Sequence, residues 1–346
     1  MHFLIEIVHP ADVLFFIRPM RMLQEAGHRT TVVSRHKDVA CALLDRFEID
    51  HIPISTKGDG VVGLGMELLR RNLALWRIVR RDRPDLMLGF GGVSVSQVGW
   101  LTGVPSLIVY DSEYATLQTR LAWPFLTRLI VPGDYTGKTP VGRTEYLPGT
   151  KDFSYFHPSA FTPDLDVAKS LGFDPERRNI FMRLVKWGAN HDIGKTGLSE
   201  DQLGQLVARL APLGKLHVSA ETDAPDIVAP YLFRGDPQLI HHLMGHCDLY
   251  VGESATMACE AVALGLPAIY AGVDFWGYVA GLARRDLITC VQPGDRDTLA
   301  DIAEARLLDH SAFASARKRW LGEVPDWAEV VVRRAVELAG QAASER

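Results

Sequence analysis

The chain has 346 residues, of which 47% are hydrophobic and 23% are charged, so we expect two globular domains with ordinary cores. Its net charge of −5 argues against a general nucleic-acid binder and favours a small-molecule partner. No apolar run reaches the roughly 18 residues that a membrane-spanning helix needs. The stretch MHFLIEIVHP predicts a strand rather than a signal peptide, and the four cysteines lack paired spacing, so we expect a cytoplasmic protein with reduced thiols.

The first half of the sequence alternates short apolar runs with amphipathic segments. Strands are expected at residues 3–8, 28–34, 51–55, 85–90, 106–110, 129–132 and 144–147. Helices are expected between the early strands, at 12–26, 39–47 and 66–83. This order with short connections is typical of a doubly wound parallel sheet.

A literal GxGxxG at Gly58–Gly63 follows the third strand rather than the first. No acidic residue ends a strand about 20 residues later, so the dinucleotide-binding fingerprint is incomplete. We interpret this stretch as a flexible cleft loop before the helix at 66–83.

Two kinds of side chain line that helix. One side carries Leu69, Leu73 and Trp76, and another carries Arg70, Arg77 and Arg81. The basic side fits a solvated helix face, and it also fits contact with anionic lipid or with a lipid-phosphate acceptor.

Glycines and carboxylates follow two of the expected strands. Gly89, Gly91 and Gly92 precede a helix that Ser94 can cap, and they allow the backbone to approach a ligand closely. Asp111 and Glu113 come just after the strand at 106–110, where a carboxylate can act as a general base or bind sugar hydroxyls or a metal. Helix capping explains Asp111 equally well.

The second half repeats the α/β pattern. Strands are expected at 179–184, 215–219, 249–251, 268–270 and 287–291, and helices at 200–213, 237–246, 254–264, 297–307, 310–321 and 326–344.

The stretch DLYVGESATMACEAVALGLPAIYAG, residues 248–272, predicts a strand, a tight turn, a helix and a second strand. Ser254 is placed to cap the helix and Gly265 to end it, with a buried stripe at Met257, Ala258, Ala261 and Leu264. The amides at the start of this helix suit a phosphate, while Thr256 and Glu260 lie one turn apart on its flank. They fit a pyrophosphate and ribose site, and equally a plain α/β unit with a solvated Glu260.

Three segments resemble the DUF354 family: HPADVLFFIRPMRMLQEAGHRTTVVSRHKD, DSEYATLQTRLAWPFLTRLIVP and GESATMACEAVALGLPAIY. That family is related in fold to nucleotide-sugar glycosyltransferases and to the non-hydrolysing UDP-N-acetylglucosamine 2-epimerases. The resemblance, over about residues 1–310, implies a GT-B fold, with two Rossmann-like parallel-sheet domains facing a central cleft. We expect an acceptor-side domain at 1–160 and a nucleotide-sugar-binding domain at 161–325. A helix at 326–346 is expected to pack across both domains and return to the first.

Residues 249–272 are also similar to the donor site of the glycosyltransferase that completes the peptidoglycan lipid precursor. This similarity implies that Glu260 binds the donor ribose and that Ser254, Ala255 and Thr256 face the diphosphate. Glu253 stands where glycine or serine is usual, and a carboxylate beside a diphosphate must turn away or pair with a cation. Arg183 and Lys186 are candidate cations, and Gly252 and Asp274 complete the expected donor site.

The combined prediction is a metal-independent glycosyltransferase that uses a nucleotide diphosphate sugar, with a UDP-sugar favoured, and no tightly bound cofactor. The acceptor, a glycan or lipid-linked molecule, is expected over His9 and the Gly89–Gly92 loop. His9 or Asp111 would be the general base, although His9 can instead cap the following helix. A 2-epimerase using Asp111, Glu113 and Glu253, and a non-catalytic nucleotide-sugar-binding scaffold, are the alternatives. Peripheral contact with the inner face of the membrane is expected through Arg70, Arg77 and Arg81.

Overall fold

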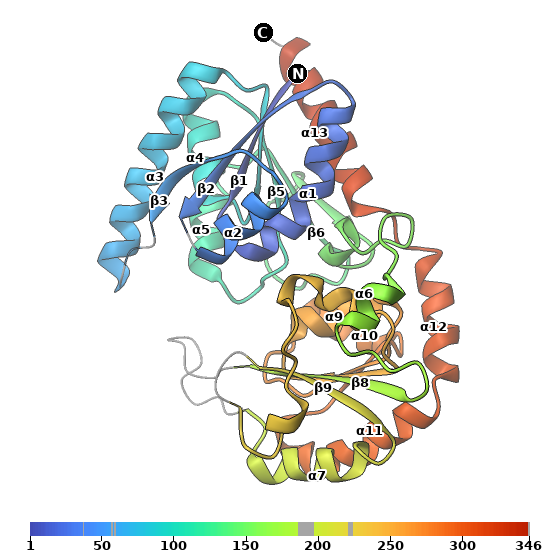
Figure 1. The fold of residues 1–346 in the computed structure, drawn as a ribbon. Coiled ribbons are helices and arrows are strands. Elements are labelled where there is room, and N and C mark those ends of the chain that lie inside the picture. The colour runs from blue at the N-terminus through green and yellow to red at the C-terminus, as the bar shows by residue number, and fades with distance from the viewer. Residues whose placement is uncertain (37, 57, 59, 186–196, 221–223, 345–346) are drawn as a thin grey trace. The chain divides into compact units, whose positions relative to one another are not determined.

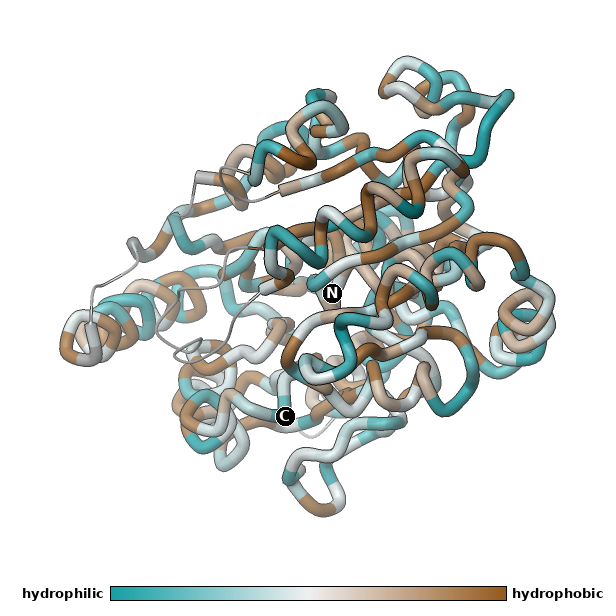
Figure 2. Tube along the Cα trace, turned by 90° about the horizontal axis from the view of Figure 1, so that it is seen from below, coloured by the Kyte–Doolittle hydropathy of each residue, from teal (hydrophilic) through white to brown (hydrophobic). Residues whose placement is uncertain are grey.

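The computed structural model describes residues 1–344 apart from 37, 57, 59, 186–196 and 221–223. The chain forms two compact units (Figure 1). The N-terminal unit comprises Met1–Tyr155 and Pro325–Arg346, and the C-terminal unit comprises Phe156–Val324. Hydrophobic residues recur along the strands and helices of both units, with hydrophilic residues between them (Figure 2).

A seven-stranded parallel sheet forms the centre of the N-terminal unit, in the order β3-β2-β1-β4-β5-β6-β7. Its strands are β1 (His2–Ile7), β2 (Arg29–His36), β3 (His51–Thr56), β4 (Leu86–Phe90), β5 (Ser106–Val109), β6 (Arg128–Pro132) and β7 (Thr144–Leu147). Ile5 of β1 pairs with Val32 on one side and with Leu88 on the other. The doubly wound parallel sheet predicted from the sequence is therefore confirmed.

Two groups of helices cover this sheet (Figure 1). The helices are α1 (Pro10–Glu25), α2 (Asp38–Arg46), α3 (Gly60–Asp82), α4 (Val93–Thr102), α5 (Thr116–Ala122) and α13 (Trp327–Ser344), with a 3₁₀ turn η1 at Lys151–Ser154. Helices α2 and α13 pack on α1, whereas α4 packs between α3 and α5. Leu75 and Val79 of α3 share a core cluster with Leu4, Val33 and Met87 of the sheet.

Helix α13 comes back to the N-terminal unit through defined polar contacts. The guanidinium of Arg18 binds the Asp326 carboxylate with an Nη2–Oδ2 distance of 2.7 Å. The indole N–H of Trp327, a fully buried residue, donates to the carbonyl of Pro148 at 2.9 Å. These contacts hold the last helix against α1 and η1.

Helix α3 begins at Gly60, so the expectation of a loop through Gly63 and a helix starting at Met66 is wrong. Glycine inside a helix costs only about 1 kcal/mol relative to alanine, which tertiary packing can override. Glu67 in α3 accepts a hydrogen bond from the Gly58 N–H at 3.0 Å, which ties the preceding chain to the helix.

The C-terminal unit contains a five-stranded parallel sheet in the order β12-β11-β10-β8-β9. Its strands are β8 (Arg178–Leu184), β9 (Gly214–Ala220), β10 (Leu249–Gly252), β11 (Ala268–Tyr270) and β12 (Ile288–Cys290). Its helices are α6 (Leu165–Ser170), α7 (Glu200–Leu210), α8 (Ile240–Met244), α9 (Ala255–Leu264), α10 (Gly277–Arg284), α11 (Leu299–Leu308) and α12 (Ser311–Leu321). Three 3₁₀ turns, η2 (Ala229–Tyr231), η3 (Pro237–Leu239) and η4 (Pro293–Thr298), complete it.

Helices α7 and α11 pack together over one face of this second sheet. Leu203 and Leu206 of α7 and Ala303 of α11 share a buried cluster with Ile180 and Met182 of β8. In parallel sheets of this kind, ligands bind beyond the carboxyl ends of the strands. A ligand site is therefore expected beyond the carboxyl ends of the strands in each unit.

The helices in the described part of the chain are too short or too polar to cross a bilayer. Among the same residues, no group of three or more His, Cys, Asp or Glu side chains is placed to hold a metal ion.

Candidate functional site

The start of α9 lies at the carboxyl end of β10, as the sequence predicts. Ser254 is the N-cap, and its Oγ accepts a hydrogen bond from the Met257 N–H at 3.3 Å. The N–H groups of Ala255 and Thr256 donate to no acceptor among the described residues. Gly265, with φ of 101°, ends the helix. This helix therefore presents unused amides, together with the positive end of its dipole, at the sheet edge.

Glu253 is buried, and its carboxylate turns onto the backbone. One oxygen accepts from the Val185 N–H at 3.1 Å and the other from the Leu198 N–H at 2.6 Å. The Glu253 N–H donates to the carbonyl of Arg183 at 3.0 Å. With both oxygens bonded to main chain, Glu253 joins the end of β8 to the chain entering α7. The role of Glu253 at a donor, or as an acid or base, stays a prediction, and its carboxylate is held by main-chain amides in this structure.

Glu260 is buried in α9, with 7% of the residue exposed. Its Oε2 lies 3.1 Å from Nε2 of His241 in α8, and the His241 ring packs 4.5 Å from the ring of Phe156. The other oxygen, Oε1, has no hydrogen-bond partner within the described chain.

The burial of α9 differs from the expected single stripe. All residues from Ala258 to Ala263 are buried, whereas Met257 and Leu264 are only partly covered. The alternative of a plain α/β unit with a solvated Glu260 is wrong in this respect, because α8, β10, β11 and β12 pack around the helix and Glu260 is buried.

The other expected donor-side residues lie around this helix or outside the described chain. Arg183 is the penultimate residue of β8, and its Nη1 donates to the Ser219 hydroxyl on β9 at 2.7 Å. Gly252 pairs with Arg183 in the sheet, where an added Cβ would lie 2.7 Å from the Arg183 carbonyl oxygen. The carbonyl of Asp274 accepts from the Tyr270 hydroxyl at 2.9 Å. Lys186 falls outside the described residues.

In the N-terminal unit, His9 is the N-cap of α1. Its Nδ1 accepts a hydrogen bond from the Ala11 N–H at 3.2 Å. A neutral imidazole that accepts at Nδ1 carries its proton on Nε2, so this side chain is a donor at its outer nitrogen. The capping alternative for His9 is therefore confirmed, and its role as the general base stays a prediction.

Asp12 completes the same capping box and was not identified from the sequence. Its Oδ2 accepts from the N–H groups of Val8 at 3.0 Å and His9 at 2.8 Å. Burial raises the pKa of Asp12 to about 7, although these hydrogen bonds and the nearby Lys151 ammonium act in the opposite direction. An acidic residue three positions after a cap was the available signal.

Asp111 forms a buried ion pair with Lys151. The Oδ2–Nζ distance is 2.7 Å, and the side chains are 6% and 17% exposed. The ammonium also lies 5.1 Å from the ring centre of Phe90 at the end of β4. Burial lowers the pKa of Lys151, but the carboxylates of Asp111 and Asp152 outweigh it and raise the pKa above its ordinary value.

This pairing changes two sequence-based interpretations. The cap of α5 is Ala115, which has no side-chain cap bond, so the alternative that Asp111 caps a helix is wrong. Lys151 is a further polar residue at this edge, and the sequence offered no signal for it because it lies 40 positions from its partner. Glu113 has different partners: its Oε1 accepts from the N–H of Thr136 at 3.2 Å and from its hydroxyl at 3.4 Å.

The glycine loop after β4 is explained by packing. Gly91 and Gly92 have φ of 68° and 39°, and a Cβ at either would collide with Gln118 or Ile108. Gly89 lies within β4, where a Cβ would meet Gly92 at 3.2 Å. The cap of α4 is Gly92 rather than Ser94, so that expectation is wrong.

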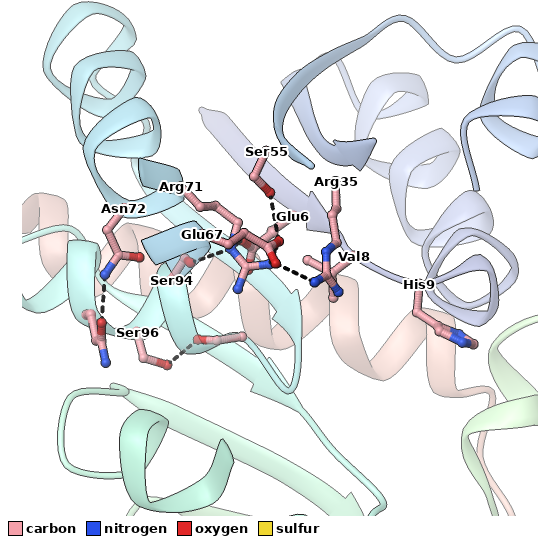
Figure 3. A network of polar contacts seen from close by, with 12 residues as sticks. Glu6, Val8, His9, Arg35, Ser55, Glu67, Arg71, Asn72, Ser94 and Ser96 are labelled. Atoms are coloured by element: carbon pink, nitrogen blue, oxygen red, sulfur yellow. Dashed lines mark hydrogen bonds and ion pairs between the residues drawn. The ribbon is translucent and has the colours of Figure 1, made fainter. Parts of the chain in front are cut away.

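Ser94 is instead buried within a network of charged side chains that connects α3 to the first strands (Figure 3). Arg71 Nε donates to Ser94 Oγ at 2.9 Å and lies 3.7 Å from Glu6 Oε1. Glu67 accepts from Arg35 at 2.5 Å and from the Ser55 hydroxyl at 3.2 Å. Burial raises the pKa of Glu6, whereas the Arg35 and Gly58 bonds outweigh burial at Glu67 and lower its pKa.

Comparison with known proteins agrees with this architecture. The family described as "Protein of unknown function (DUF354)" matches residues 1–184. A UDP-N-acetylglucosamine–N-acetylmuramyl-(pentapeptide) pyrophosphoryl-undecaprenol N-acetylglucosamine transferase from Anaeromyxobacter dehalogenans (strain 2CP-C) is 37% identical over 82 residues. That match covers 22% of this chain and 21% of the transferase, so the chain spans about a fifth of this relative's length.

Solved structures match over nearly the whole chain. The UDP-GlcNAc 2-epimerase from Neisseria meningitidis, bound to UDP-GlcNAc, has a TM-score of 0.74 at 12% identity, covering 97% of this chain and 100% of the epimerase chain. The glycotransferase of kitacinnamycin has a TM-score of 0.68 at 13% identity, covering 98% and 99%. At these identities the likeness establishes the fold, which is GT-B.

Proposed function

We propose that this chain, which belongs to the DUF354 family, is a glycosyltransferase that moves a sugar from a nucleotide diphosphate sugar to a glycan or lipid-linked acceptor. Its fold is that of GT-B glycosyltransferases and related epimerases. The proposal takes UDP-sugars as the favoured donors because the 82-residue match is to a UDP-N-acetylglucosamine-dependent transferase.

The observation that carries this proposal is the half-buried start of α9, where two N–H groups lack acceptors in the described chain. The Ala255 and Thr256 N–H groups lack acceptors in the described chain and point out of the positive end of a ten-residue helix. Such an end stabilises a diphosphate both as ligand and as leaving group. Glu260, one turn further on, keeps Oε1 available for ribose hydroxyls while Oε2 contacts His241.

In the proposed reaction, the bond between sugar C1 and the diphosphate oxygen breaks, and a bond from an acceptor oxygen to C1 forms. The nucleoside diphosphate leaves with the electron pair of the broken bond, and the acceptor hydroxyl loses its proton to a base. Asp111 is the base in this proposal, because its carboxylate is held in place by Lys151 at 2.7 Å. His9 is not, because its Nδ1 is bonded to the backbone.

The hydrogen bonds of Glu253 argue against both alternative functions, the 2-epimerase and the non-catalytic scaffold. An epimerase needs acid and base carboxylates on both faces of C2, and Glu253 is committed to the Val185 and Leu198 amides. A free carboxylate beside the diphosphate site would favour a non-catalytic scaffold, whereas the Glu253 carboxylate binds main-chain amides. Incorporation of solvent deuterium at C2 of a UDP-sugar would identify an epimerase, because a transferase leaves C2 unchanged.

The test is a thermal-shift screen against UDP, GDP, ADP, CMP and dTDP with their common sugars. Ligand binding to the folded state raises the unfolding midpoint by mass action. We expect UDP compounds to raise the midpoint of the wild type and of a charge-matched control, Glu304→Gln, but not of Glu260→Gln. Glu304 suits the control because it lies in the same unit and pairs with Arg209.

Release of nucleoside diphosphate in the presence of glycan or lipid-linked acceptors then tests turnover. Absence of a shift with every nucleotide, or an equal shift in Glu260→Gln, would remove the proposed donor site. Binding without turnover on any acceptor would favour the scaffold.

We also propose that α3 brings the protein to anionic membranes. The helix exposes Val62 (81%), Leu69 (63%) and Leu73 (48%), and Arg70 and Arg77 are exposed on its basic side. Apolar residues that face solvent beside cations suit the interface of an anionic bilayer. Arg81 is bonded to Asp82 at 2.6 Å, so its charge is partly neutralised.

Co-sedimentation with vesicles tests this membrane contact. We expect binding to vesicles that contain phosphatidylglycerol and little binding to phosphatidylcholine alone. Leu69→Gln with Leu73→Gln should weaken binding to both, whereas Arg70→Ala with Arg77→Ala should remove the preference for the anionic lipid. Equal sedimentation with both vesicle types would exclude the role of the arginines.

A further inference from the structure

A pocket of about 780 Å³ opens in the N-terminal unit between α5 and the segment 135–143. Both elements follow strand ends: α5 comes after β5, and the segment comes after β6. The carboxyl ends of parallel strands are the usual place for ligands, and small-molecule sites have volumes of roughly 300–1,000 Å³. The segment 111–132, which resembles the DUF354 family, supplies Glu113 and the α5 residues of the lining, and the proposed donor site does not account for this pocket.

Aromatic rings form a firm wall of the pocket. Trp123 and Tyr135 line it, and both pack against Tyr110, with ring centres 5.4 Å and 6.5 Å away. Arg143 donates to the carbonyls of Leu126 at 2.7 Å and Trp123 at 3.2 Å, which holds α5 and the segment together. The flat apolar surface is therefore preformed and suits the face of a sugar ring.

The pocket is positively charged although the chain as a whole carries a net charge of −5. Arg120, Lys138 and Arg143 line it, opposed by the single acidic side chain of Glu113. Arg120 and Lys138 are exposed, and neither bonds or pairs with another described residue. Two unused cations beside an aromatic wall favour an anionic ligand.

Neutral polar groups complete the lining. Glu113 holds Thr136 through both its N–H and its hydroxyl, and Thr116 and Thr119 add hydroxyls from α5. Hydroxyl groups next to an aromatic face recognise sugar hydroxyls, and the Glu113 carboxylate holds Thr136 in place. An isoprenoid or fatty chain alone would leave these groups without partners.

We propose that this pocket binds a phosphorylated sugar, with the ring on Trp123 and Tyr135 and the phosphate between Arg120 and Lys138. The inference rests on the proposed function in one respect: it makes the phosphorylated sugar the acceptor. The phosphate belongs either to a free sugar phosphate or to a lipid-linked one, since both present the same chemistry to the pocket.

Calorimetry on the full chain without nucleotide tests the pocket directly. The probes are N-acetylglucosamine 1-phosphate and glucose 1-phosphate, with the uncharged sugars and inorganic phosphate for comparison. We expect a sugar phosphate to bind at least about tenfold more tightly than either the uncharged sugar or inorganic phosphate. The same sugar phosphate with a short isoprenoid tail separates the sources: tighter binding indicates a lipid-linked ligand, and equal binding a free one.

Two double variants with the same change of charge locate the binding. Arg120→Ala with Lys138→Ala should weaken sugar-phosphate binding at least about tenfold. Arg21→Ala with Arg333→Ala, in the same unit but on α1 and α13, should leave it within about twofold. Thermal unfolding of each variant verifies that it folds.

Equal loss in both double variants, equal affinity for the uncharged sugar, or no binding of any sugar phosphate would overturn the proposal. Failure of the pocket is separable from failure of the proposed function, because the donor site is measured by nucleotide shifts that depend on Glu260. Sugar-phosphate binding without nucleotide binding would keep the pocket and remove the transferase. Nucleotide binding without sugar-phosphate binding would keep the proposed donor site and remove the proposed role of the pocket.

Discussion

The two parallel-sheet units organise the carboxyl ends of their strands in different ways. In the N-terminal unit, charged side chains pair with one another there, as in Glu67 with Arg35 and Asp111 with Lys151, and Asp12 adds bonds to the main chain after β1. In the C-terminal unit, a side-chain carboxylate binds main-chain amides at this edge: Glu253 accepts from the Val185 and Leu198 N–H groups. Sheets with the same parallel topology therefore support their edges with different chemistry.

The difference determines which polar groups of each unit remain available to a ligand. Buried charges that pair with one another are costly to separate, so the network around Glu67 positions α3 rather than binding a ligand. In the C-terminal unit, the Glu253 carboxylate binds main-chain N–H groups of other segments. The first N–H groups of α9 remain without acceptors in the described chain. The proposed anion-binding end therefore lies in the C-terminal unit, and the lining of the cationic pocket in the N-terminal unit includes none of Glu6, Arg35, Glu67 and Arg71.

Removal of Glu67 should give the largest effect. Glu67→Ala leaves Arg35 without its buried partner and Arg71 with Glu6 as its remaining carboxylate, and we expect the free energy of unfolding to fall by about 3 to 5 kcal/mol. Urea unfolding measures the loss, and hydrogen exchange should place it in the N-terminal unit. The double change Glu67→Met with Arg35→Met should cost less than Glu67→Ala alone; an equal or larger cost would mean that the pairing is not what the network provides.

Removal of Glu253 is the matching test in the other unit. Glu253→Ala leaves the Val185 and Leu198 N–H groups without acceptors, and we expect a loss of about 2 to 4 kcal/mol. Glu253→Gln retains one acceptor oxygen and should recover part of this loss. Hydrogen exchange that accelerates in the N-terminal unit rather than around β8 and α7 would contradict the assignment.

The pH dependence of stability should contain a contribution from Asp12. Its pKa is raised by burial from 3.8 to about 7, so between these values the folded protein holds a proton that the unfolded chain releases. Stability from this group is therefore lost as the pH rises from about 4 to 7. Asp12→Asn should remove that decline, measured as urea midpoints at pH 5 and pH 8; an unchanged difference between the two midpoints would exclude Asp12.

His217 should contribute in the opposite direction, with the smallest effect. Burial lowers its pKa from 6.5 to about 4, with a minor contribution from Lys215, and its Nε2 lies 2.9 Å from Asn179 Oδ1. Between these values the unfolded chain binds a proton that the folded protein does not, so stability falls as the pH drops from 6.5 to 4. His217→Gln should flatten this acid limb, and an acid limb as steep as in the wild type would count against it.

Local features of the sequence determined the succession of strands and helices along the chain, the parallel architecture and the limits of α9. Ser254 and Gly265 were identified because a capping hydroxyl and a left-handed glycine act within one turn of their own helix. The family resemblance added the GT-B fold, which the whole-chain structural matches agree with. Periodicity and capping are short-range properties, so they can be read without the fold.

Tertiary packing alone decided the rest. It turned the Glu253 carboxylate onto two backbone amides, paired Asp111 with a lysine distant in sequence, and buried Glu260 beside His241. It also built the cationic pocket from segments that follow two different strands. These outcomes depend on which groups meet after the chain folds, because burial and pairing of charges are set by neighbours distant in the sequence.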